Sequence, residues 1–138
     1  MSKLIEILKR HEGVKNTLYK CTSDKWTIGV GRNLEDVGLS EEEIDILLQN
    51  DITRTEELLD EYMSWWSDLD YIRQDAMINF VFNVGIGTAM KFKKAMTALE
   101  QGDYDVAADE MMDSNWSKQV GQRAVEVTEM IRTGEYQD

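Results

Sequence analysis

The chain has 138 residues, of which 27 are Asp or Glu and 15 are Lys or Arg, so its formal net charge is −12 at pH 7. A surface of this charge repels nucleic acid backbones, which argues against DNA or RNA as a partner. The length suits one domain, and a chain of this size buries enough surface to fold without a disulfide or a metal. The composition therefore predicts an acidic globular domain without a structural cofactor.

The single cysteine, Cys21, cannot form an internal disulfide, which fits synthesis in a reducing compartment. The first residues, MSKLIEILKRHEG, are interrupted by charged side chains and lack the apolar run of a signal peptide. No segment approaches the roughly 20 apolar residues that cross a bilayer. We therefore expect neither a signal peptide nor a membrane anchor.

The first elements are a helix followed by a small antiparallel hairpin. Ile5 and Leu8 share one face of a predicted helix over residues 3–12, which Gly13 would end. Residues 17–34 then alternate apolar with polar or small side chains around the turn-rich CTSDK, which predicts the hairpin. Gly29 and Gly31 lie within its second strand, where glycine often marks a bulge or a close approach by another group.

The remainder of the chain is predicted to be helical. Ser40 and Glu43 form a capping box at the start of a long helix over about residues 40–65, which would measure about 38 Å. A buried central helix follows from residue 71 to Gly85, and one or two short helices end at Gly102. An amphipathic helix follows Asp103, and a last helix begins near residue 119 and ends near Gly134. The predicted fold class is α+β and mostly helical.

The sequence HEGVKNTLYKCTSDKWTIGVGRN, residues 11–33, resembles the catalytic stretch of the phage-type lysozymes, glycoside hydrolase family 24. That stretch has a glutamate, eight residues, an aspartate or cysteine, five residues and a threonine, followed by TIGxG. The pattern falls here on Glu12, Cys21 and Thr27. The resemblance continues in RQDAMINFVFNVG (73–85) and NWSKQVGQRAVEVTEMIRTGEY (115–136), in the family's order.

The resemblance implies one lysozyme-like domain over residues 1–138. Residues 13–45 would form a small β-containing lobe, residues 1–12 and 60–138 a helical lobe, and residues 40–65 the connecting helix, with a substrate cleft at the junction. The implied protein is a monomeric, cofactor-free phage endolysin whose partner is bacterial peptidoglycan. It would hydrolyse the β-1,4 bond between N-acetylmuramic acid and N-acetylglucosamine. It would be made in the host cytoplasm and reach the cell wall with the help of a holin.

The chain departs from the family's pattern in three respects. Many members have aspartate where this chain has Cys21, and several members are basic. The segment RNLEDVGLSEEE, between the strands and the long helix, is also short, so we expect the upper wall of the cleft to be reduced.

Glycoside hydrolysis requires a proton donor for the leaving oxygen and a group that assists the oxocarbenium-like carbon. Glu12 is the predicted acid, and partial burial beside the cleft would keep its carboxyl protonated. Cys21 occupies the position of the second carboxylate. Its thiolate either attacks the anomeric carbon, which retains configuration, or orients and deprotonates a water held by Thr27, which inverts it.

The resemblance also assigns supporting roles to residues outside this stretch. Arg123 matches an arginine that pairs with the catalytic glutamate. Leu34, Phe82 and Asn83 match positions that contact the sugar. Without the resemblance, the same residues are compatible with ordinary structural roles, such as a surface ion pair for Arg123.

Three other functions remain compatible with the sequence. One is a catalytically impaired peptidoglycan-binding protein of the same fold, since the usual aspartate is missing. Another is a lytic transglycosylase that uses Glu12 alone and releases an anhydro sugar. The third is an acidic interaction protein, such as a nucleic-acid mimic, which would concentrate its negative charge on one face.

Overall fold

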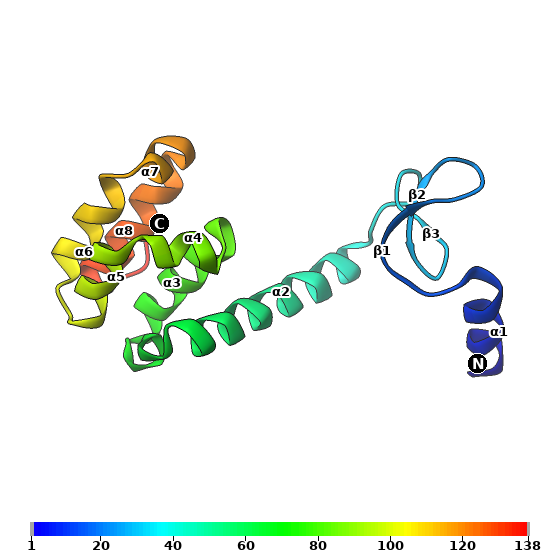
Figure 1. Cartoon of the computed structure of the whole chain (residues 1–138), viewed down its shortest axis with the longest axis horizontal. Helices are drawn as coiled ribbons and strands as arrows, with labels where there is room; N and C mark the ends of the chain where they lie inside the picture. The colour runs from blue at the N-terminus through cyan, green and yellow to red at the C-terminus, as the bar shows by residue number, and fades with distance from the viewer. Residues whose placement is uncertain (1, 138) are drawn as a thin grey trace. The chain divides into compact units, whose positions relative to one another are not determined.

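The computed structural model describes residues 2–137, and the chain divides into two compact units at the bond between Leu47 and Leu48 (Figure 1). Unit 1 contains the sheet, and unit 2 contains most of the helices. The long helix α2, Glu41–Tyr62, begins in unit 1 and ends in unit 2. The mostly helical α+β class predicted from the sequence is confirmed.

Unit 1 begins with α1, Ser2–Glu12, which is followed by a three-stranded antiparallel sheet. Strands β1 (Lys15–Lys20), β2 (Trp26–Gly29) and β3 (Arg32–Asn33) lie in sequence order, so the predicted hairpin is confirmed and extended by a short third strand. Tyr19 pairs with Thr27, and the register is irregular between Lys15 and Tyr19. Three of the predicted site residues lie on or next to this sheet. Cys21 directly follows β1, Thr27 is on β2, and Leu34 directly follows β3.

The start of α2 is fixed by the predicted capping box. The Ser40 amide donates to Glu43 Oε1 at 2.8 Å, and the Glu43 amide donates to Ser40 Oγ at 3.1 Å. The helix ends at Tyr62, slightly earlier than expected, and the 3₁₀ helix η1, Ser64–Asp68, follows it. The buried residues of α2 are Thr55 and Leu59, whereas Leu47 and Leu48 are about half exposed.

In unit 2, α3, Tyr71–Val84, packs against α4, Ile86–Lys91, and α8, Gln122–Thr133. The other helices are α5 (Lys93–Glu100), α6 (Tyr104–Met112) and α7 (Asn115–Val120). Phe80 of α3 is fully buried and makes edge-on contacts with Phe92 and Trp116, with ring centroids 5.1 and 4.9 Å apart. Helix α6 packs against both α5 and α8, and α8 packs against α3. This packing fixes α3, which carries Phe82 and Asn83, against α8, which carries Arg123.

The predicted start of the last helix, near residue 119, was wrong. Residues 115–120 form α7, and α8 begins only at Gln122. Gly121 has φ of +60°, which interrupts helical geometry and which glycine adopts without the strain of a Cβ. Asp103 precedes α6 as expected, but its side chain makes no capping hydrogen bond. In residues 2–137, no helix combines the length and the apolar character required to cross a membrane.

Arg73 joins the start of α3 to the end of α8. Its Nε donates to the carbonyl of Ile131 at 2.6 Å, and its Nη2 donates to the carbonyl of Arg132 at 3.2 Å. Its Nη1 pairs with Asp70 at 3.0 Å, and the guanidinium carbon lies 3.6 Å from the centroid of the Tyr104 ring. The last carbonyls of a helix have no partner within the helix, so Arg73 satisfies groups that would otherwise require water.

Replacing Arg73 by Lys should lower the free energy of unfolding of the helical unit by about 2 kcal/mol. Lysine keeps the charge, but it lacks the planar guanidinium with which Arg73 reaches two carbonyls and a carboxylate at once. Urea unfolding followed by far-UV circular dichroism measures the loss. The matched control is Arg54→Lys, because Arg54 also pairs with an aspartate three residues away but is 68% exposed. Equal effects of the two substitutions would contradict this role.

Candidate active site

Glu12 is the last residue of α1, where the chain turns towards the sheet. Its carboxyl lies against Gly31, and a Cβ built at position 31 would collide with Oε2 of Glu12. Gly31 also has φ of +69°, a conformation that side chains disfavour. We expected another group to approach the chain closely at Gly29 or Gly31. The group that approaches Gly31 is the carboxyl of Glu12, the predicted acid. Glu12 itself is exposed, so unit 1 does not supply the partial burial that we expected.

Cys21 lies in the tight turn between β1 and β2. The Cys21 amide donates to the carbonyl of Lys25 at 3.0 Å, and the Asp24 amide donates to the carbonyl of Cys21 at 2.8 Å. The turn requires φ of +61° at Asp24, a residue type that tolerates this region better than most. Cys21 is half-buried and is the free thiol of the chain.

Thr27 lies on β2 next to this turn and is 2% exposed. Its hydroxyl donates to the carbonyl of Lys25 at 2.8 Å. Hydrogen bonds from the backbone of Lys25 and of Ser23, and then from the Thr27 hydroxyl, lower the pKa of the Cys21 thiol below its ordinary value of 9.0. The hydroxyl has one proton, so donation to the sulfur competes with donation to the Lys25 carbonyl. The structure thus brings Cys21 and Thr27 together, as their spacing in the sequence suggested.

Leu34 follows β3 and remains close to the sheet. Its amide donates to the carbonyl of Trp26 at 2.9 Å, and its carbonyl accepts from the Gly38 amide at 3.1 Å. Its side chain is half-buried. Unit 1 therefore contains Glu12, Cys21, Thr27 and Leu34, while the convergence of the Glu12 carboxyl with the Cys21–Thr27 pair stays a prediction.

The other predicted site residues lie on α3 and α8 in unit 2. Phe82 and Arg123 line a cavity of about 300 Å³. Arg123 donates from Nε to Asn79 Oδ1 at 2.9 Å and from Nη2 to the carbonyl of Asn79 at 3.3 Å. The predicted pairing of Arg123 with Glu12 joins residues of different units and stays a prediction.

Asn79 is a partner of this site that the sequence reasoning missed. It precedes Phe82 by three residues and Asn83 by four, so the three side chains share one face of α3. That spacing was the available signal. Asn83 is itself held in place, because its Oδ1 accepts a hydrogen bond of 2.8 Å from the indole of Trp116, which is 6% exposed. Its amide nitrogen is the group left for a ligand.

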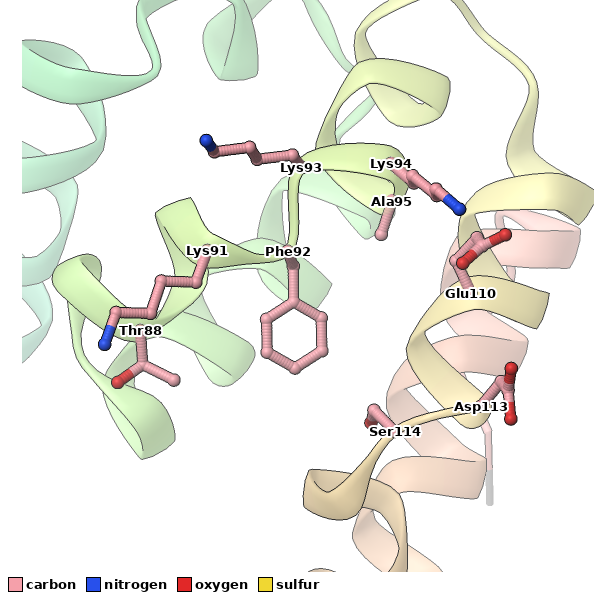
Figure 2. Close-up of a pocket in the computed structure, with 9 residues that line it drawn as sticks. All are labelled: Thr88, Lys91, Phe92, Lys93, Lys94, Ala95, Glu110, Asp113 and Ser114. Atoms are coloured by element: carbon pink, nitrogen blue, oxygen red, sulfur yellow. The ribbon is translucent and has the colours of Figure 1, made fainter.

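A second cavity of unit 2, about 510 Å³ in volume, lies between the α4–α5 junction and the end of α6 (Figure 2). The ring of Phe92 points into its opening, as Figure 2 shows. Lys91, Lys93 and Lys94 line one side, and none of them forms an ion pair within residues 2–137. Carboxylates of α6 and of the loop after it line the other side, so the cavity has mixed charge. Within the same described residues, no group of three or more His, Cys, Asp or Glu is arranged to hold a metal ion.

The lowered pKa of Cys21 predicts a reactive thiol. The alkylation rate with iodoacetamide should rise with pH around a midpoint below 9.0, since the thiolate is the reacting form. Thr27→Val removes the hydroxyl, so the thiolate loses one hydrogen bond and the midpoint should move to higher pH. Thr22→Val is the control, because Thr22 is exposed beside Cys21 and does not affect the pKa of the thiol. A midpoint at or above that of a cysteine in an unstructured peptide, measured in parallel, would overturn the prediction.

Comparison with known proteins identifies relatives of this chain. A family model described as phage lysozyme matches residues 9–132. The chain is 29% identical over 163 aligned positions to probable T4-type lysozyme 1 of Dictyostelium discoideum, covering 97% of this chain and 96% of that protein. It is 33% identical over 116 positions to an endolysin of Acyrthosiphon pisum secondary endosymbiont phage 1, covering 81% of this chain and 75% of the endolysin.

The alignment with the Dictyostelium protein spans 163 positions, more than the 138 residues present here, so that protein has segments without a counterpart in this chain. An endolysin of Bacillus phage B103 is 31% identical over 123 positions, which cover 85% of this chain and 45% of the endolysin. The family match extends over most of the chain and includes every residue of the candidate site. The chain therefore belongs to the phage lysozyme family.

Proposed function

We propose that Glu12, Cys21 and Thr27 carry out the reaction by which this lysozyme hydrolyses the β-1,4 bond between N-acetylmuramic acid and N-acetylglucosamine in peptidoglycan. The chain is a glycoside hydrolase because it belongs to the phage lysozyme family, and endolysins are among its relatives. We assign it to glycoside hydrolase family 24, as a variant with cysteine at the usual aspartate. The observation that carries the proposal is the family match over residues 9–132, which includes Glu12, Cys21 and Thr27, and the lowered pKa of the Cys21 thiol supports it.

In the proposed reaction, Glu12 donates a proton to the glycosidic oxygen as the bond from that oxygen to the anomeric carbon breaks. The carboxyl must be protonated at this moment. Glu12 is exposed in unit 1, so a bound sugar chain would itself supply the cover that removes water from the carboxyl.

Cys21 then acts in one of two ways, which differ in their product. As a nucleophile, the thiolate bonds to the anomeric carbon, and water later cleaves this thioglycoside with Glu12 acting as the base, so the configuration is retained. As a base, the thiolate takes a proton from a water that Thr27 holds, and that water attacks the anomeric carbon, so the configuration is inverted. The anomer released therefore identifies the role of the sulfur.

We assign Leu34, Phe82 and Asn83 to contacts with the sugar chain and Arg123 to support of Glu12. Phe82 is 43% exposed and offers an apolar ring, while the amide nitrogen of Asn83 offers a donor beside it. The biological role that follows is lysis of the bacterial host by a monomeric enzyme that is made in the cytoplasm and released to the cell wall through a holin.

Product analysis of peptidoglycan digested in ¹⁸O-labelled water tests the reaction and the acid together. The unsubstituted protein should release reducing ends that carry one ¹⁸O, and Glu12→Gln should reduce the rate at least a hundredfold, because an amide cannot donate the proton. Glu6→Gln, an equal charge change on the same helix, should leave the rate unchanged. Anhydro sugars without label would indicate a transglycosylase, and binding without cleavage would indicate an impaired binding protein. Either outcome would overturn the proposal.

Activity should rise with moderate salt. A chain of net charge −12 repels an anionic cell wall, and screening within a Debye length of about 8 Å at 0.15 M salt weakens that repulsion. Initial rates of turbidity loss of a cell-wall suspension between 10 and about 200 mM NaCl measure this effect. A rate that falls steadily from the lowest salt concentration would show that attraction dominates the encounter.

A further inference from the structure

Arg32 of β3 binds three oxygen atoms in unit 1. Its Nη1 donates to Glu43 Oε1 at 2.9 Å and to the carbonyl of Gly38 at 3.0 Å, and its Nη2 donates to Glu43 Oε2 at 2.6 Å. The two bonds to Glu43 form the bidentate arrangement that makes an arginine–carboxylate pair both strong and directional. Exposed single ion pairs contribute little, but a bidentate pair with a third acceptor fixes the side chain in one orientation.

Glu43 is held from the other side as well, because it belongs to the capping box of α2. Its Oε1 accepts from the Ser40 amide at 2.8 Å in addition to Arg32. Hydrogen bonds from the Arg32 side chain and then from the Ser40 amide lower the pKa of Glu43 to about 2, so the carboxylate stays charged at neutral pH. One carboxylate thus joins β3, the loop after it and the first turn of α2.

The segment closed by this pair carries two groups of the proposed site. Arg32 directly follows Gly31, against which the Glu12 carboxyl lies, and Arg32 pairs with Ile28 across the sheet. Gly38, whose carbonyl Arg32 binds, donates its amide to the carbonyl of Leu34. Movement of Arg32 would therefore displace both the backbone beside the acid and the loop that presents Leu34.

We infer that Arg32 and Glu43 are positioning residues for the proposed reaction, because they hold Gly31 against the Glu12 carboxyl and hold Leu34 beside β2. The inference rests on the proposed roles of Glu12 and Leu34. The pair touches no reacting atom in this role, and it acts through the backbone of β3 and the loop over residues 34–38. The hydrogen bond from Arg32 to the carbonyl of Gly38 also restrains the loop over residues 34–38.

The experiment measures kcat and KM on soluble, uncross-linked peptidoglycan strands by the release of reducing ends. Glu43→Gln removes the charge but keeps an oxygen that can accept from the Ser40 amide, so the helix cap is retained. Its kcat should fall about tenfold, and its KM should rise about threefold because Leu34 is less well placed. Arg32→Met should show the same pattern, and Arg32→Lys should recover part of kcat because it restores the charge without the fork.

Glu42→Gln is the matched control. It removes the same charge from the neighbouring position of the same helical turn, and the Glu42 side chain makes no hydrogen bond or ion pair within residues 2–137. Its kinetic constants should equal those of the unsubstituted protein. Rates are normalised to the folded fraction from circular dichroism, so that loss of folded protein cannot imitate loss of positioning.

Unchanged kcat and KM per folded molecule in Glu43→Gln and Arg32→Met, with an active unsubstituted protein, would overturn this inference alone. A reduction of equal size in Glu42→Gln would also overturn it, since the effect would then be one of net charge. An inactive unsubstituted protein would instead overturn the proposed function on which the inference rests.

Discussion

The contact between the Glu12 carboxyl and the backbone of Gly31 is the constraint on which the candidate site depends. The carboxyl occupies the space that a side chain at position 31 would take, and the positive φ of Gly31 excludes most other residues independently. The positive φ favours glycine at this position, whereas the Glu12 carboxyl is the end of a flexible side chain that can shift. Gly29, at the end of β2, also adopts φ of +69°.

In the proposed reaction, Cys21 of the turn between β1 and β2 takes the place of a carboxylate. A free thiol is mostly protonated at neutral pH, so it needs surroundings that favour its anion. Here these surroundings are backbone amides and one hydroxyl rather than a cationic side chain. Backbone donors carry no net charge, so they stabilise the thiolate without forming an ion pair.

Unit 2 contributes a rigid frame for the residues assigned to substrate. Phe80, Phe92 and Trp116 form an aromatic cluster in its core, and the indole of Trp116 fixes Asn83 through a hydrogen bond. Arg123 is held by both the side chain and the carbonyl of Asn79. A side chain whose rotamer is set by a neighbour loses less entropy when a ligand binds, which suits the proposed role of these residues in binding the sugar chain. The cavity beside Phe92 has mixed charge, with lysines on one side and the carboxylates of Glu110 and Asp113 on the other.

The sequence by itself determined the order and type of nearly all elements, the capping box of α2 and the Cys21–Thr27 spacing. These features depend on periodicity, on residue types that cap helices and on contacts between residues close in the chain. Only the tertiary structure decided that Gly121 divides the last helices, that Asn79 holds Arg123, and that Arg32 pairs with Glu43. Arg32 and Glu43 are eleven residues apart, and Asn79 and Arg123 are forty-four apart. Such pairs are formed by chain packing, and no local pattern records which distant side chain a given arginine will meet.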